Sequence, residues 1–290
     1  MVFIRNRHIV NSALYGTAAA GAFAISGLLL GGPAYGASGI AGQVLGAGAP
    51  IANSTVTSWA ASAEAPRQLE QTHTGPDGRF TLNADTQGAD VYITANGGRP
   101  TANPAAQSNP VVTLLAVLGS TPPASVIVNE MTTIASVWTN AQFLDGTTLK
   151  GNPLGLGIAA GNVPNFVDVA TGGYGVTIQD ALNSGQTPTM ANFATLATVL
   201  AGCVTQVKPD ACDQFFAATT PRSGKTPADT LTALEGVARD SSYKPERLFA
   251  LLNAFYPIPS GKNLRPVPFT PISPGHRAPG RCRSSSAAAA

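Results

Sequence analysis

The hydrophobic pattern of this chain changes its period at Asn129. Before that residue, short apolar runs alternate with polar residues between Gly, Pro and Asn turns, a pattern typical of short strands. After it, apolar residues recur every three or four positions, which is the spacing of amphipathic helices. We therefore predict an α+β chain. A small antiparallel β-sandwich in residues 38–98, completed by two apolar runs within 111–128, precedes a mostly α-helical module in residues 129–256.

One turn and one core position of the predicted sandwich follow from local chemistry. Pro76-Asp77-Gly78 is a strong turn signal, because Pro presets φ and Gly accepts a positive φ. We expect Gly78 to serve a hairpin, and Phe80 to face the core. The Pro- and Asn-rich residues 99–110 read as a linker that precedes the last two strands.

The helical module carries helix start and stop signals. Asn129 is a good N-cap for a helix that stops at Gly146. Its helical period turns Met131, Ile134 and either Val137 or Trp138 toward one apolar face, and we take Trp138 as a core residue. A Gly-rich segment within 154–170 is expected to form a helix broken at Pro164. Further helices are expected over residues 190–203, 211–218, 226–239 and 245–255.

Residues 1–37 have the layout of a secretory signal peptide. A basic start is followed by the uncharged stretch 12–32 and then by small residues. We expect cleavage after Gly36 or Ala37, which makes the mature protein secreted or periplasmic and leaves no stable membrane span. A retained membrane anchor is the open alternative, since the uncharged stretch is just long enough to cross a bilayer.

The predicted export makes the cysteines informative, because oxidising compartments permit disulfides. Cys203 and Cys212 are nine positions apart, and Pro209 forces a turn between the two apolar segments that carry them. We predict a disulfide that clamps two helices folded back on each other; two unrelated buried thiols are the open alternative. Reduction is expected to weaken the helical module and to leave the sandwich unaltered.

The charge distribution argues against a nucleic-acid partner. Only 11% of the residues are charged, and five arginines lie within the first eight and last fourteen positions. Without these five, 12 Lys and Arg face 15 Asp and Glu, so no basic surface remains. Residues 257–290 are Pro-rich and end in a run of alanines, and we expect them to form a disordered tail.

No constellation of residues points to catalysis, a cofactor or a metal ion. Once the signal segment is removed, the histidines are His73 and His276, which belong to different predicted regions. Residues 241–244 fit the S-x-x-K spacing of penicillin-binding enzymes without the companion motifs, so they read as a helix start. Trp138 is interpreted as a core residue rather than a carbohydrate platform. We therefore predict a protein that is not an enzyme.

The sandwich region resembles a known domain family. Gly42-Gln43-Val44, residues 50–57 (PIANSTVT) and residues 74–82 (TGPDGRFTL) together resemble the carboxypeptidase regulatory-like domain. The resemblance implies a prealbumin-like, or Ig-like, β-sandwich. The sequence departs from the family pattern at Asn53-Ser54, where the family usually has Gly-Ala. This departure affects the tightness of one turn and not the fold.

The helical region resembles a module of secreted bacterial proteins. Residues 128–138 (VNEMTTIASVW), 196–203 (LATVLAGC) and 228–239 are similar to the helices that follow an Ig-like or regulatory-like sandwich in those proteins. The resemblance covers residues 125–268 and includes the cysteine pair. There, a β-propeller of the NHL-repeat or virginiamycin-lyase-like kind usually comes next, and this sequence contains no such repeats. The resemblance implies a shared architecture and no known activity.

Two functional hypotheses follow. The first is a non-enzymatic exported scaffold or binding module, a truncated member of a larger surface or secreted protein, which binds an unknown protein or carbohydrate at the cell surface without a cofactor. The alternative is the remnant of a propeller-containing lyase or hydrolase that lacks its catalytic domain. Propeller repeats encoded in another frame of the downstream DNA would favour the alternative.

Overall fold

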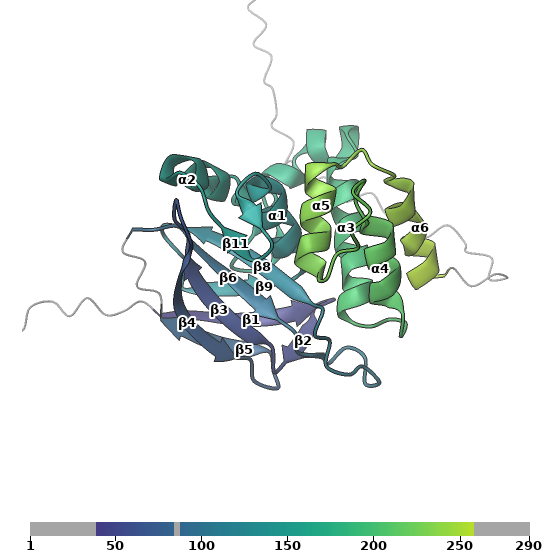
Figure 1. Cartoon of the computed structure of the whole chain (residues 1–290), viewed down its shortest axis with the longest axis horizontal. Helices are drawn as coiled ribbons and strands as arrows, with labels where there is room; N and C mark the ends of the chain where they lie inside the picture. The colour runs from purple at the N-terminus through teal and green to yellow at the C-terminus, as the bar shows by residue number, and fades with distance from the viewer. Residues whose placement is uncertain (1–38, 84–87, 258–290) are drawn as a thin grey trace, which may run out of the picture. The chain divides into compact units, whose positions relative to one another are not determined.

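The computed structural model describes residues 39–83 and 88–257 of the chain (Figure 1). The predicted cleavage positions Gly36 and Ala37, and the predicted tail beyond residue 257, lie outside the described residues. The described part has antiparallel sheets followed by several helices, which confirms the predicted α+β fold class.

Two sheets carry the strands of the first half of the chain. One has the order β4-β3-β6-β8 and is antiparallel throughout. The other has the order β5-β1-β2-β7, and β9 joins it by pairing with β1 in parallel, which the sequence does not indicate. The strands are β1 (Gly39–Gly46), β2 (Ala49–Ala52), β3 (Thr55–Ala60), β4 (Arg67–His73), β5 (Arg79–Asn83), β6 (Val91–Asn96), β7 (Arg99–Pro100), β8 (Thr113–Gly119) and β9 (Ser125–Val128).

The second half of the described chain is mainly helical. Its helices are α1 (Glu130–Asn140), α2 (Pro153–Gly161), α3 (Thr189–Val204), α4 (Ala211–Thr219), α5 (Thr230–Arg239) and α6 (Glu246–Phe255). Figure 1 shows α3, α4, α5 and α6 grouped together, and each of them packs against at least one of the others. Between α1 and α3 the chain also forms two hairpins and three short helical turns: β10 (Leu144–Asp145) with β11 (Thr148–Leu149), β12 (Val167–Asp168) with β13 (Gly173–Tyr174), η1 (Val163–Asn165), η2 (Thr177–Gln179) and η3 (Leu182–Gln186).

Asn129 caps α1 through a reciprocal pair of hydrogen bonds. Its Oδ1 accepts from the Thr132 amide at 2.9 Å, and the Thr132 hydroxyl accepts from the Asn129 amide at 2.8 Å. The predicted stop at Gly146 is wrong, because α1 already ends at Asn140. Gly146, with φ +57°, is the first residue of the two-residue turn between β10 and β11, a position that requires a positive φ.

The predicted start of α5 is also wrong by one helical turn. The N-cap is Asp229 rather than Thr226, and its Oδ1 accepts from the Thr232 amide at 2.9 Å. The next residue, Thr230, is the first residue of α5, and its hydroxyl donates to the Thr113 carbonyl of β8 at 2.7 Å. Pro227, which was predicted to lie in the first turn of the helix, precedes the helix and is buried.

Cys203 and Cys212 form the predicted disulfide, with their Cα atoms 4.4 Å apart. Cys203 lies one residue before the end of α3, and Cys212 is the second residue of α4. The bond therefore clamps the turn between these two helices. It holds Cys203 in the core, where that side chain is fully buried.

A single hydrophobic core runs through the strands and the helices. One cluster of buried side chains includes Ile40 and Leu82 of the sandwich as well as Phe193, Phe215 and Leu251 of the helices. Residues 99–110, expected to be a linker, begin with the short strand β7 and continue as a loop attached to the end of α3 and the turn after it. Its Asn109 Nδ2 donates to the Cys203 carbonyl at 2.9 Å, so this loop joins the two halves.

Helix hydroxyl groups cover the open edge of strand β8, the last strand of its sheet. The amides of Thr113, Leu115 and Val117 donate at 2.8, 3.0 and 2.9 Å to the hydroxyls of Thr230, Thr133 and Ser136, respectively. All three of these hydroxyl-bearing residues are fully buried. An exposed strand edge invites pairing with another chain, and here α1 and α5 take the place of a further strand.

Candidate functional site

The prediction that Trp138 lies in the core is wrong, because 41% of this residue is exposed. Its neighbours Ile134 and Val137 enter the core instead, with exposures of 3% and 1%. Consecutive residues in an α-helix are separated by about 100° around the axis, so Trp138 points away from the direction of Val137. The indole therefore lies on the flank of α1, at the surface.

Trp138 forms part of the wall of a groove with a volume of about 410 Å³. Two aromatic rings beside it hold each other in place: Phe166, just after η1, stacks on Phe193 of α3 with ring centres 6.1 Å apart. Tyr174 of β13 contacts the same Phe193 ring at 6.1 Å. The apolar lining of the groove consists of Ile134, Trp138, Phe166, Phe193 and Leu196.

The polar part of the lining is neutral. It consists of Thr189, Asn192 and Ser241, whose hydroxyl and amide groups can both donate and accept hydrogen bonds. The acid beside Ser241, Asp240, is paired with Arg222 at 2.5 Å. A hydrogen bond from Arg222 lowers the pKa of Asp240, so this carboxylate stays ionised and its charge is compensated.

The groove can hold a ligand through apolar contacts and a small number of hydrogen bonds. Ligand sites in proteins are usually concave, mostly apolar, and equipped with a few placed polar groups, and this lining has that composition. Thr189 and Ser241 carry the hydroxyl groups among the lining residues, and the described histidine, His73, lies far along the chain on β4. A positioned acid or base beside the nucleophile, which catalysis requires, is not among these lining residues.

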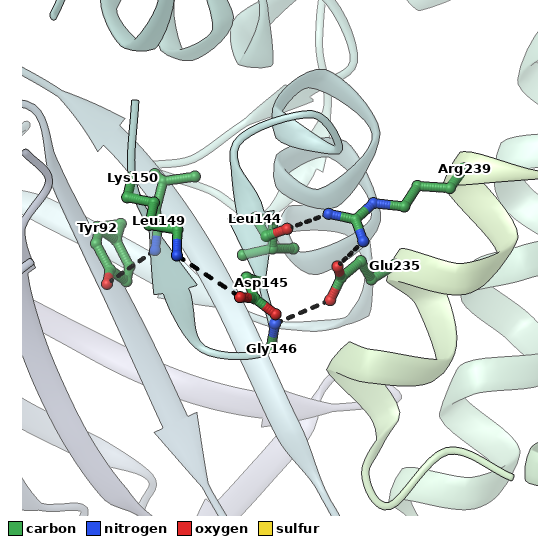
Figure 2. A network of polar contacts seen from close by, with 8 residues as sticks. All are labelled: Tyr92, Leu144, Asp145, Gly146, Leu149, Lys150, Glu235 and Arg239. Atoms are coloured by element: carbon green, nitrogen blue, oxygen red, sulfur yellow. Dashed lines mark hydrogen bonds and ion pairs between the residues drawn. The ribbon is translucent and has the colours of Figure 1, made fainter. Parts of the chain in front are cut away.

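A second candidate is the polar network around Glu235 and Arg239 of α5, shown in Figure 2. The Glu235 carboxylate lies 2.7 Å from the Arg239 guanidinium and accepts from the Gly146 amide at 2.9 Å. Arg239 also donates to the carbonyls of Ala141 and Leu144. Burial raises the pKa of Glu235, and the bond from Gly146 opposes this effect.

The same network continues from the hairpin to the sheet (Figure 2). Tyr92 of β6 donates to the Thr147 carbonyl at 3.1 Å and accepts from the Leu149 amide at 3.3 Å. At the rim, Lys150 lies 3.8 Å from Asp145. The charged groups at the centre of the network thus bond to one another and to backbone, so we assign it the structural role of joining α5, the β10–β11 hairpin and β6.

A third hollow, of about 490 Å³, lies beside α2 and contains Asp90. Burial raises the pKa of this carboxyl group. Ser62 and Ser120 are among its other lining residues, and Ser62 already donates to the Ala65 carbonyl at 2.8 Å.

In the described residues no cluster of three or more His, Cys, Asp or Glu side chains could hold a metal ion.

The residues singled out in the sequence lie in separate places. Gly78 has φ +74° in the turn before β5, and Phe80 of β5 is buried in the core. Asn129 caps α1, and the cysteine pair closes the turn after α3. Among the predicted site residues that the structure describes, Trp138 alone lines the groove. Within the described chain, no helix combines the length and the apolar character needed to span a membrane.

The groove residues that the sequence did not reveal come from three distant segments. Phe166, Phe193 and Ser241 are separated by 27 and 48 positions in the sequence and meet only in the folded chain. One signal was available at Trp138, because the helical period of α1 allowed either Val137 or Trp138 to face the core. Where the helical period allows either of two adjacent apolar residues to face the core, an aromatic residue of the pair is a candidate for the surface.

Comparisons with known proteins add no family. No family model matches the chain, and none of the curated proteins matches it. Among solved structures, the chain is similar to a 9R-lipoxygenase from Cyanothece PCC8801, with 14% sequence identity over 63% of this chain and 26% of that one. The TM-score of 0.20 is too low for this similarity to carry an argument about fold or activity.

Proposed function

We propose that this protein is a non-enzymatic exported binding module whose Trp138 groove holds a neutral, mostly apolar ligand. The observation that carries the proposal is the exposure of Trp138 in a groove with an uncharged lining. A charged ligand would lose its hydration there without gaining an opposite charge, which is costly. A ring or a branched aliphatic group would instead bury apolar surface against Trp138 and Leu196.

Two further observations support this reading. The sequence of residues 1–37 has the layout of a signal peptide, and a disulfide between Cys203 and Cys212 suits an oxidising compartment outside the cytoplasm. The groove floor is held by stacked rings and by α1 and α3, so it is formed before any ligand arrives. A preformed site needs little ordering on binding, which favours affinity.

The proposal is tested with small probes and the indole N–H signals of the ¹⁵N-labelled mature chain. Benzyl alcohol is expected to shift the Trp138 signal, and benzoate, its charged counterpart, is expected to bind at least about tenfold more weakly because its carboxylate is desolvated without a partner. Trp59 is the internal control, since its Nε1 donates to Thr94 Oγ1 at 3.0 Å and it lies outside the groove.

Matched variants complete this experiment. Trp138→Ala is expected to abolish benzyl alcohol binding, and Val176→Ala, at an apolar position with 86% exposure outside the groove, is expected to leave it unchanged. Binding that persists in Trp138→Ala, or equal binding of benzoate and benzyl alcohol, contradicts the proposal.

A further inference from the structure

We propose that the Trp138 groove is occupied by a proline-rich segment of the same chain, residues 266–274. This inference rests on the proposed function, because it names the neutral, mostly apolar ligand that the groove takes. The segment lies outside the described residues, and three features support it as the occupant: its sequence, the lining of the groove, and the point at which the described chain ends.

The chemistry of the segment matches the groove. Residues 266–274 read PVPFTPISP and contain no charged side chain, like the groove lining. Pro268, Pro271 and Pro274 recur at every third position, which is the repeat of the polyproline II helix. In that conformation the three rings lie along one edge, and the other positions carry apolar or hydroxyl side chains.

The groove offers what a proline-rich segment binds. Such segments dock in grooves lined by aromatic side chains, which contact the proline rings. Here Trp138 and Phe166 supply aromatic surface. A polyproline II helix makes no internal hydrogen bonds, so its carbonyls need donors. The amide of Asn192 and the hydroxyls of Thr189 and Ser241 are placed at the groove to supply them.

The end of the described chain lies close enough to the groove for residues 266–274 to reach it. Tyr256, which follows α6, donates from its hydroxyl to the Thr198 carbonyl of α3 at 3.3 Å. Leu196, a groove residue, precedes Thr198 by two positions, about 3 Å along the helix axis. The segment must pass around α3, which is about 10–12 Å across with its side chains. The nine residues 257–265 span up to about 30 Å when extended, which is sufficient.

The inference is tested in the full chain with the indole N–H signal of Trp138. In the triple variant Pro268→Ala, Pro271→Ala and Pro274→Ala, we expect this signal to move away from its wild-type position. The double variant Pro259→Ala and Pro279→Ala removes prolines outside the repeat and is the matched control, in which the signal stays. A synthetic peptide of residues 265–275, added to the triple variant, is expected to return the Trp138 signal toward its wild-type position.

Competition gives a second measurement. A tethered segment acts at an effective concentration of about millimolar, so benzyl alcohol is expected to bind the triple variant at least about threefold more tightly than the wild type. The Trp138 signal of the wild type is expected to stay the same on dilution. A signal that moves on dilution shows that a second copy supplies the segment and overturns the intramolecular proposal.

The outcomes separate the two proposals. If benzyl alcohol binds at Trp138 with equal affinity in all variants and the peptide does not shift the signal, the occupant proposed here is wrong while the groove remains a binding site. If neither benzyl alcohol nor the peptide shifts the Trp138 signal in the triple variant, both proposals fail.

Discussion

At the scale of single residues, Glu130 is a buried acid whose ionisation is coupled to the stability of the fold. It occupies the first position of α1, is almost fully buried, and accepts from the Ala47 amide at 2.8 Å. Burial raises the pKa of Glu130 from 4.5 to about 7, against the lowering effect of the backbone amides of Glu130 and Ala47. Tyr256 is nearby: burial, and then the charge of Glu130, raise the pKa of its hydroxyl.

This pKa predicts a pH-dependent stability. A carboxyl whose folded pKa exceeds its unfolded pKa stabilises the fold fully below the unfolded value, and the contribution is lost as pH rises through the folded value. For Glu130 the window runs from pH 4.5 to about pH 7. Over it the contribution falls by about 3 kcal/mol.

Glu130→Gln tests this window. The variant keeps an oxygen for the Ala47 amide and cannot ionise, so at pH 8 we expect it to be more stable than the wild type by up to about 3 kcal/mol. Below pH 4.5 the two should agree to within about 1 kcal/mol. Urea unfolding across this pH range measures the difference. A constant difference at every pH would show that Glu130 does not titrate in the folded state.

At the scale of elements, the arrangement of α1 beside β8 shows why local sequence patterns do not predict the contacts between elements. The period change and the cap at Asn129 placed the start of α1, because these signals act within a few residues. Thr133 and Ser136 looked like ordinary polar helix positions, yet they are buried acceptors for Leu115 and Val117 amides. Their role depends on a strand that the local sequence does not contain.

Thr133→Val tests the covering of the β8 edge. The change preserves shape and removes the acceptor of the buried Leu115 amide, so we expect a loss of about 1–3 kcal/mol in the free energy of unfolding. Thr198→Val is the matched control. Its hydroxyl is exposed and bonds within its own helix, so we expect a loss below about 0.5 kcal/mol. Urea unfolding measures both, and equal losses would contradict the role given to Thr133.

At the scale of the whole molecule, the strands and the helices share one core, and this could not be read from the chain. A change of hydrophobic period marks where strands give way to helices and says nothing about whether the two parts separate. Residues 99–110 were rich in Pro and Asn and read as a linker. The structure binds this loop to the helices through Asn109 and the Cys203 carbonyl.

The shared core changes the outcome expected from reduction. Opening the Cys203–Cys212 loop is expected to reduce stability by about 2–3 kcal/mol. Because Asn109 ties this turn to the sandwich, we now expect sheet and helix signals to melt together at one lower midpoint, rather than the helices alone. Circular dichroism in the far ultraviolet and tryptophan fluorescence, recorded with and without reductant, follow the two parts. A sandwich transition that stays in place would show that the two parts unfold independently.

Trp138 forms part of the wall of a surface groove and does not lie in the core. The most direct measurement is the stability and the benzyl alcohol affinity of Trp138→Ala in the same preparation. Because 41% of Trp138 is exposed and the rest is packed, we predict an intermediate loss of about 1–3 kcal/mol in the free energy of unfolding, together with a loss of binding of at least about tenfold. A stability loss of about 3–5 kcal/mol, as a core tryptophan gives, with unchanged binding would contradict the claim.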